Sequence, residues 1–401
     1  MGDLLLRGGR PWGSDGPADI LIRDGVLTRV EPRVDPLDAP GAEMLDAPGA
    51  EVLDVSGQLV LPGLVEAHCH LDKTLYGGPW VPHTAGDALA DRIANERGRR
   101  GELGVPDVDR IVALLERMIA AGTTHVRTHT DIDPALGLSG VAAVHAAAER
   151  LAGRIDVRQV AFPQYGVLTN PGTAELLAEA LESGVDAVGG LDPAGIDRDP
   201  VGHLDVVFGL AERHDAAVDI HLHDGGSLGT WQLELIAART AALGLGGRVA
   251  VSHAYGLGQA DRSTQERIAD LLAAAGVAVV TAAVYDFPVA PVKVLRAAGV
   301  TVACGHDGIR DLWGPYGSGD MLERAMHLAY RSTFRRDADI ELALEAATYG
   351  GAALLGLPGY GLVPGAPADL VVVAAGTPAE AVVTRPPRTL VLKAGRVVTA
   401  S

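Results

Sequence analysis

Two histidines one residue apart, His68 and His70, end an apolar run that begins at Leu61. Because side chains two residues apart on a β-strand point to the same face, the strand tip presents both imidazoles together. Neutral imidazole is a common ligand of Zn²⁺ and Fe²⁺. A lone His-X-His also occurs by chance or in core packing, so the pair by itself marks only the start of a candidate metal site.

Three later apolar runs, each typical of a buried strand, also end in ligand-type residues. They carry His221 with His223, His253, and Asp307. Four strand tips with such groups in this order are hard to attribute to coincidence. We therefore predict one divalent metal per subunit, Zn²⁺ or alternatively Fe²⁺, held by His68, His70, His221 and Asp307.

This ligand set is typical of hydrolytic metal sites. Three imidazoles and a carboxylate leave room for a water whose pKa a metal lowers toward about 7. We expect Asp307 to accept the proton of that water and His223 to donate one to the leaving nitrogen. We expect His253 to orient the attacking water or to polarise the ring of the substrate. Asp224 is a poorer proton donor, because a continuing strand would turn it to the other face.

The middle of the chain alternates predicted strands with helix-like segments, which favours a (β/α)₈ TIM-type barrel with its site at the carboxyl ends of the strands. A doubly wound open sheet is the alternative, but no Gly-rich phosphate loop follows the first strand. The predicted strands are 61–70, 124–131, 156–163, 185–192, 217–224, 248–254, 277–283 and 300–307. The predicted helices include 108–121, 173–183, 201–214, 228–243, 264–275 and 289–298.

Both ends of the chain read as short strands with turns, including a hairpin around Asp24-Gly25. We expect residues 1–60 and 362–401 to form one composite β-sandwich, and 61–361 to form the barrel. A short repeat, 38–43 again at 46–51, predicts a surface loop insertion.

The composition of the chain excludes several classes of protein. The chain has 401 residues, 48% of them hydrophobic, and a net charge of −18. The acidic balance argues against nucleic-acid binding. The beginning of the chain does not read as a signal peptide, and no run is long and apolar enough to span a membrane, so we expect a cytoplasmic protein. Two cysteines, Cys69 and Cys304, imply no disulfide framework and read as small apolar fillers.

Seven blocks of sequence together resemble the amidohydrolase superfamily, within it the cytosine deaminase-like branch. They are LPGLVEAHCHLDKT (61–74), HVRTHTDID (125–133), QVAFPQYGV (159–167), DAVGGLDP (186–193), VDIHLHDGGSLG (218–229), GRVAVSHA (247–254) and CGHDGIRDLWGPYGSGDM (304–321). The resemblance implies hydrolysis of C–N bonds on nitrogen heterocycles with one Zn²⁺ or Fe²⁺. It also implies a homo-oligomer, a dimer or a tetramer.

Two departures from the cytosine deaminase pattern point to another group within the superfamily. Asp224 stands where they carry a glutamate proton shuttle, and it is preceded by His223. Gly308 follows the last-strand aspartate, where they have an acidic residue. Both features are more similar to the N-isopropylammelide isopropylamidohydrolases, which remove an alkylamine from an s-triazine ring. That resemblance implies His223 as the shuttle, Lys73 and Trp313 as supports of the active site, and Gln164 and Asp192 as substrate contacts.

The expected function is therefore hydrolysis of an exocyclic amino or alkylamino group from a small nitrogen heterocycle such as a pyrimidine or an s-triazine. Two enzymatic alternatives stay open, a cytosine deaminase proper and a hydrolase that opens a cyclic amide. Opening of a cyclic amide would favour a site with two metals. The lysine that often bridges two such metals is absent from the predicted strand 185–192, which argues against this alternative. A scaffold of this fold without metal is a third alternative, which the complete ligand set disfavours.

Two further expectations concern the surroundings of the site. Glu66 and Arg127 alternate inward on neighbouring strands, so we predict an ion pair between them below the metal, because an unpaired buried charge is costly. The loop at 75–105, with Trp80 and several glycines, is predicted to cover the substrate.

Overall fold

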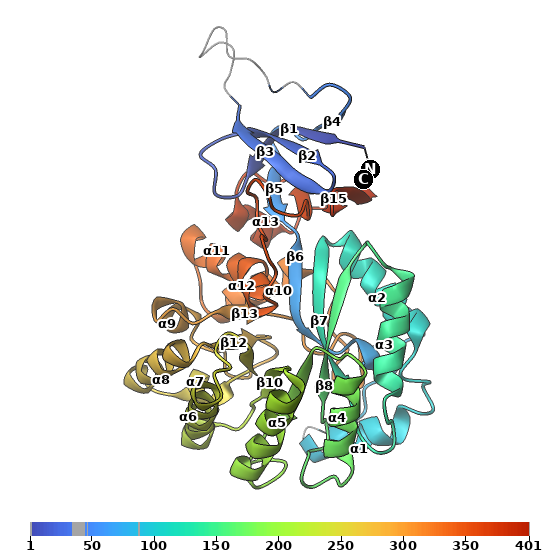
Figure 1. Ribbon diagram of the computed structural model, residues 1–401, viewed down its shortest axis with the longest axis vertical. Coiled ribbons are helices and arrows are strands. Elements are labelled where there is room, and N and C mark those ends of the chain that lie inside the picture. The colour runs from blue at the N-terminus through green and yellow to red at the C-terminus, as the bar shows by residue number, and fades with distance from the viewer. Residues whose placement is uncertain (1, 34–44, 46, 87–88, 401) are drawn as a thin grey trace.

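The computed structural model describes residues 2–33, 45, 47–86 and 89–400. Figure 1 shows a barrel surrounded by helices, with a smaller sheet at one end to which both termini contribute. The first copy of the predicted loop repeat, 38–43, lies outside the described residues. The division at residues 61 and 362 stays a prediction.

Eight parallel strands form the barrel in consecutive order, so each strand pairs with the next along the chain. They are β6 (Leu64–Cys69), β7 (Thr123–Asp131), β8 (Asp156–Phe162), β9 (Ala187–Leu191), β10 (Ala217–His221), β11 (Val249–Ser252), β12 (Val277–Thr281) and β13 (Val302–Cys304). The predicted (β/α)₈ barrel is confirmed, and every predicted strand overlaps one of these. Except for β7, which begins one residue earlier than predicted, the strands are shorter than predicted, and several of their predicted last residues lie in loops that carry the site.

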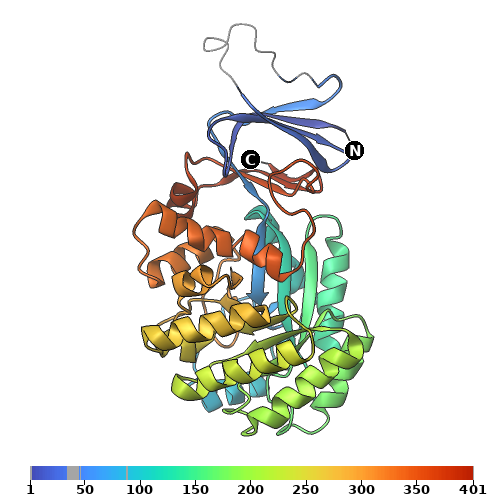
Figure 2. The same cartoon turned by 60° about the vertical axis from the view of Figure 1, so that its left-hand side comes forward.

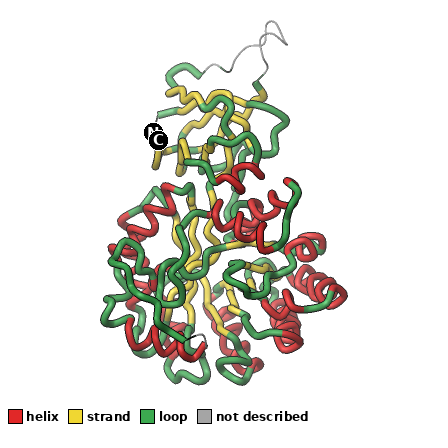
Figure 3. Tube along the Cα trace, turned by 180° about the vertical axis from the view of Figure 1, so that it is seen from behind, coloured by secondary structure: helices red, strands yellow, loops and turns green. Residues whose placement is uncertain are grey.

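Helices cover the outside of the barrel, and Figure 3 shows them around the central strands. They are α1 (Leu89–Arg99), α2 (Val108–Ala120), α3 (Ser139–Arg150), α4 (Thr173–Glu182), α5 (Pro200–His214), α6 (Gly226–Ala242), α7 (Tyr255–Gln259), α8 (Arg262–Ala275), α9 (Val292–Ala297), α10 (Met321–Arg331), α11 (Asp337–Ala346) and α12 (Tyr349–Leu354), with a short 3₁₀ turn at η1 (Leu71–Lys73). Side-chain caps mark some starts: the Asp107 carboxylate accepts two backbone N–H groups at the start of α2.

The terminal segments share one sheet in the order β16-β15-β14-β5-β1-β2-β3, with β4 beside β1. Its elements are β1 (Leu4–Pro11), β2 (Ala18–Arg23), β3 (Val26–Pro32), β4 (Glu51–Asp54), β5 (Leu59–Pro62), β14 (Leu370–Val373), β15 (Arg388–Lys393) and β16 (Arg396–Ala400), with α13 (Pro378–Thr384) between β14 and β15. Leu6 and Ile22 from the first end share a core with Val372 and Leu392 from the other. The expectation that both ends of the chain combine into one β-rich unit is therefore confirmed, including the hairpin at Asp24-Gly25, and its strands form a single connected sheet.

The direction of the strands decides where the site lies. β5 runs almost directly into β6, so the barrel strands begin next to the terminal sheet and their carboxyl ends face away from it (Figure 2). In a barrel of this type the carboxyl ends carry the active site. Within the part of the chain that the structure describes, no helix is long and apolar enough to cross a membrane.

Candidate metal centre and active site

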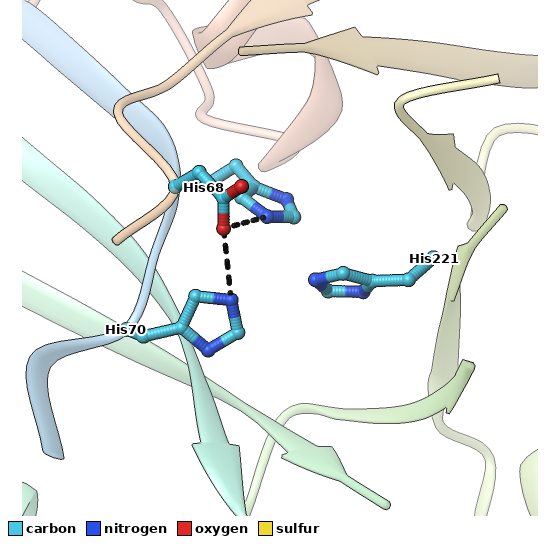
Figure 4. A group of neighbouring side chains, drawn as sticks. His68, His70 and His221 are labelled. Carbon is cyan, nitrogen blue, oxygen red and sulfur yellow. Dashed lines mark ion pairs between the residues drawn. The ribbon is translucent and has the colours of Figure 1, made fainter. Parts of the chain in front are cut away.

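The structure brings the four predicted metal ligands together at the carboxyl ends of three strands. His68 lies on β6 and His70 directly after it, His221 ends β10, and Asp307 follows β13. One nitrogen or oxygen atom of each residue lies within 4.8 Å of the corresponding atoms of the others. Figure 4 shows the three histidine rings around a common centre, with the carboxylate beside two of them.

The ring nitrogens of this cluster are in the form that binds a cation. Nδ1 of His68 lies 2.9 Å from the Ser252 hydroxyl, which itself donates to Asp219. That hydroxyl has one proton, so His68 must donate from Nδ1, which leaves Nε2 as the nitrogen that can face a cation. Burial lowers the pKa of His70 to about 4 and that of His221 well below its ordinary value, so both rings stay neutral.

Buried nitrogens without partners support the same conclusion. Nε2 of His68 and both ring nitrogens of His221 are buried and have no hydrogen-bond partner among the described residues. Buried polar groups are nearly always satisfied, and a bound ion is one of the few explanations when they have no protein partner. The donor set, three imidazoles and one carboxylate, fits a divalent transition metal.

Asp307 completes the cluster from an unusual backbone conformation. Its φ is +65°, and its N–H donates to the carbonyl oxygen of His68 at 2.9 Å. One carboxylate oxygen lies 3.3 Å from Nε2 of His70 and 3.7 Å from Nε2 of His68. Burial alone would raise the pKa of Asp307, but the proximity of these imidazole rings holds it well below the ordinary value. The group is therefore a carboxylate.

The predicted ion pair between Glu66 and Arg127 is wrong. Arg127 pairs instead with Asp219 at 3.0 Å, and Glu66 pairs with His306 at 2.5 Å. Asp219 also lies 3.4 Å from Nε2 of His129, a buried histidine on β7, and so gives that ring an acidic neighbour. Sequence reasoning missed Asp219, although it stands two residues before His221 and therefore faces the same side of the strand.

The predicted proton shuttle, His223, lies at the edge of the cluster. Its Nδ1 is 2.9 Å from an Asp192 oxygen, so the carboxylate leaves Nε2 as the free end of the ring. Burial by itself lowers the pKa of His223, but the Asp192 carboxylate outweighs it and the pKa is raised. His253 is buried, with its ring centroid 4.4 Å from that of His223. Asp224 turns away and accepts the backbone N–H of Gly195.

Lys73, directly after β6, and Gln164, directly after β8, also line the mouth. The Lys73 ammonium donates to the Gln164 side-chain oxygen and lies 3.0 Å from Asp131 and 3.5 Å from Glu96. Its three protons can therefore all meet protein groups, and the NH₂ of the Gln164 amide donates no hydrogen bond to the described residues. Sequence reasoning missed Asp131 and Glu96, because Glu96 belongs to α1, whose place over the strands is a tertiary feature.

A cavity of about 700 Å³ opens above these groups. The predicted substrate contacts Lys73, Gln164, Asp192 and Trp313 all line it, together with His223 and Asp307. The predicted covering loop contributes Arg92 of α1 to the lining, whereas Trp80 is 69% exposed and is not part of it. The other lining residues include Phe162, Tyr255, Tyr285, Phe287, Tyr316 and Arg324.

Comparison with known proteins agrees with this geometry. The model of the amidohydrolase family matches residues 51–399. The chain is 31% identical to N-isopropylammelide isopropyl amidohydrolase of Pseudomonas sp. (strain ADP), covering 99% of this chain and 97% of that one.

Two solved structures extend the comparison. N-isopropylammelide isopropylaminohydrolase from Burkholderia multivorans ATCC 17616 is 47% identical, with a TM-score of 0.93 and coverage of 99% and 98% of the two chains. 5-Methylcytosine deaminase from Klebsiella pneumoniae is 26% identical, with a TM-score of 0.85 over 100% and 97% of the chains. The resemblance seen in the sequence motifs is confirmed: this chain belongs to the amidohydrolase family and is a hydrolase of C–N bonds.

Proposed function

We propose that the protein removes an alkylamino group from a small nitrogen heterocycle of the s-triazine type by hydrolysis of the exocyclic C–N bond. The observation that carries the proposal is the cluster of His68, His70, His221 and Asp307, with buried unpartnered nitrogens, next to the His223–Asp192 pair. The names of the Pseudomonas and Burkholderia relatives support the ring and the alkylamine.

The roles of the residues follow from their places. His68, His70, His221 and Asp307 would hold one Zn²⁺ or Fe²⁺, and a metal in such a site makes water nucleophilic near neutral pH. Asp307 accepts a proton of the attacking water, because its carboxylate reaches both the cluster and the cavity.

His223 donates a proton to the leaving nitrogen from Nε2, while Asp192 holds Nδ1 and raises the pKa of the ring, which favours its protonated form. His253 is buried beside His223, and its ring supports the position of the His223 ring. On the other side of the cavity, the free NH₂ of Gln164 binds an acceptor of the heterocycle, such as an oxo group.

An apolar wall beside His223 favours an alkylamine over ammonia as the leaving group. Tyr255 lies 5.2 Å from His223 between ring centroids and stacks on Phe287, whose centroid is 5.3 Å away at an interplanar angle of 19°. A group that leaves toward His223 therefore meets aromatic carbon. Burial of one extra methylene against such a wall is worth about 1 kcal/mol, so an isopropyl substituent gains affinity there.

The test uses two substrates with the same ring, N-isopropylammelide and ammelide, and measures released isopropylamine and ammonia by chromatography. We expect release of isopropylamine from the first, with at least about tenfold higher kcat/KM than release of ammonia from the second. We expect chelation of the metal to abolish both reactions and added Zn²⁺ or Fe²⁺ to restore them. Full activity in metal-free protein would defeat the proposal.

Deamination of a pyrimidine is the second candidate, because 5-methylcytosine deaminase shares the whole fold at 26% identity. Cytosine and 5-methylcytosine belong in the same assay. Ammonia released from them faster than isopropylamine from the triazine would favour this candidate. Opening of a cyclic amide is tested by adding a hydantoin, whose product contains a new carboxylate and no free amine.

A further inference from the structure

The barrel closes between its first and last strands at the metal cluster. In the described part of the chain, the ends of β6 and β13 are joined by one isolated bridge, between Cys69 of β6 and Asp307, which follows β13. The other neighbouring strands of the barrel pair over two or more residues, with register shifts in the β6–β7 ladder. The closing seam therefore lacks most of the backbone hydrogen bonds that hold neighbouring strands together.

The side chain of Glu66 supplies hydrogen bonds across this seam. Its Oε1 accepts the backbone N–H of His68 at 3.0 Å and the backbone N–H of His306 at 3.1 Å. Its Oε2 accepts from Nδ1 of His306 at 2.5 Å. Both side chains are fully buried. One carboxylate thus connects the strand that carries His68 to the residue that precedes Asp307.

Gly305 shows how closely the two segments approach. A Cβ at this position would lie 2.3 Å from Oε1 of Glu66 and 2.4 Å from the carbonyl oxygen of His68. Only glycine allows such contact. Two residues later, Asp307 holds φ +65° and donates its N–H to that same carbonyl of His68. The left-handed conformation of Asp307 therefore depends on the seam that Glu66 bridges.

We infer that Glu66 is a positioning residue that sets the distance between the ligands His68 and Asp307 and thereby the affinity of the metal site. The inference rests on the proposed function, since it assumes that these ligands hold a metal. Groups that orient metal ligands without touching the metal typically contribute about 10- to 100-fold to its affinity. Glu66 acts through two backbone N–H groups and one imidazole, and it needs no contact with the substrate.

The chain contains a matched control. Asp197 is also buried, accepts the backbone N–H of Val167 at 2.9 Å and of Thr169 at 3.0 Å, and pairs with Nδ1 of His203 at 2.6 Å. This carboxylate shares these kinds of partner with Glu66 and also accepts from the Thr169 hydroxyl at 2.7 Å, but none of its partners is a predicted metal ligand. Glu66→Gln and Asp197→Asn therefore remove the charge from comparable networks, of which one reaches the predicted metal site.

The experiment loads the wild type and both variants with Zn²⁺, removes free metal by gel filtration and follows metal loss to a chromophoric chelator. This readout does not depend on activity. We expect Glu66→Gln to lose its metal at least about tenfold faster than both other proteins. If the wild type holds its metal and the two variants lose metal at equal rates, the inference about Glu66 is overturned but the proposed function is not. A wild type that holds no metal would overturn the proposed function.

A second pair of variants applies if Glu66→Gln does not fold. The side-chain amide of His306→Asn places a donor near the position of Nδ1, whereas His306→Leu leaves the Glu66 carboxylate without it. We expect the asparagine variant to lose metal at nearly the wild-type rate and the leucine variant at least about tenfold faster. Equal metal loss from these two variants would also overturn the inference.

Discussion

Two groups of buried side chains at the cavity mouth differ in what their nitrogens contact. At the ends of β6 and β10, ring nitrogens of His68 and His221 are buried without a hydrogen-bond partner among the described residues. In η1, directly after β6, Lys73 is also buried, but its ammonium meets Asp131 of β7, Glu96 of α1 and Gln164 after β8. We call these groups the histidine side and the lysine side.

The difference separates side chains fit to hold a cation from a cation that already has protein partners. Buried donors and acceptors are costly unless paired, so the unpartnered nitrogens of the histidine side fit a bound cation. On the lysine side, burial by itself lowers the pKa of Lys73, but the proximity of Asp131 and Glu96 raises it. We expect this group to hold Gln164 in place rather than to perform chemistry.

The largest effect is expected from His221→Asn on the histidine side. Loss of this imidazole removes a ligand, so we expect kcat/KM to fall by at least about 10³-fold, which corresponds to the several kcal/mol that a metal contributes. Metal content, measured by atomic absorption, should fall with it. An active, metal-loaded variant would show that His221 is not a ligand.

His223→Gln separates proton transfer from metal binding on the same side. We expect kcat to fall by about 10²-fold or more, because a general acid is lost, while the metal content stays that of the wild type. The measurement pairs steady-state kinetics with metal analysis. An unchanged kcat would show that another residue donates the proton to the leaving group.

Lys73→Met tests whether the lysine side is structural. It leaves Asp131 and Glu96 buried without their cation, so we expect the free energy of unfolding to fall by about 3 kcal/mol. KM should rise more than kcat falls, because Gln164 loses its support, and the metal should be retained. Urea denaturation and kinetics measure the two effects. Loss of metal in this variant would contradict the separation of the two sides.

The smallest effect is a displaced pH profile in Asp192→Asn. The protonated form of His223 donates the proton, so activity is lost as pH rises through its pKa, which Asp192 raises. Without the Asp192 charge this pKa falls, and the descending limb of kcat/KM should move to lower pH. Activities of the wild type and the variant across the neutral and alkaline range test this. If the alkaline limb does not move, His223 is not the group whose deprotonation causes the loss of activity.

Local spacing predicted much of the fold and of the histidine side. Buried parallel strands read as apolar runs, and residues two apart share a face, so His68 with His70 and the barrel strands could be located without coordinates. Asp307 was placed with them because the carboxyl ends of all strands of such a barrel lie at one end.

The lysine side and the seam could not be predicted in the same way. The alternation of side chains tells that Glu66 and Arg127 face inward, but it does not tell which inward group each one meets. That depends on the stagger between strands, which placed Arg127 beside Asp219 and Glu66 beside His306. Glu96 was missed for a similar reason, since it reaches Lys73 from a helix whose docking no spacing encodes.

The sequence by itself determined the order of strands, the faces of their side chains and the identity of the four residues that cluster as candidate metal ligands. Only the tertiary structure decided which carboxylate pairs with which cation, that Glu66 bridges the closing seam, and that an aromatic wall lies beside His223. The physical reason is that periodicity along the chain is a local property of the backbone. Partner choice in a closed barrel depends on distances between segments far apart in sequence.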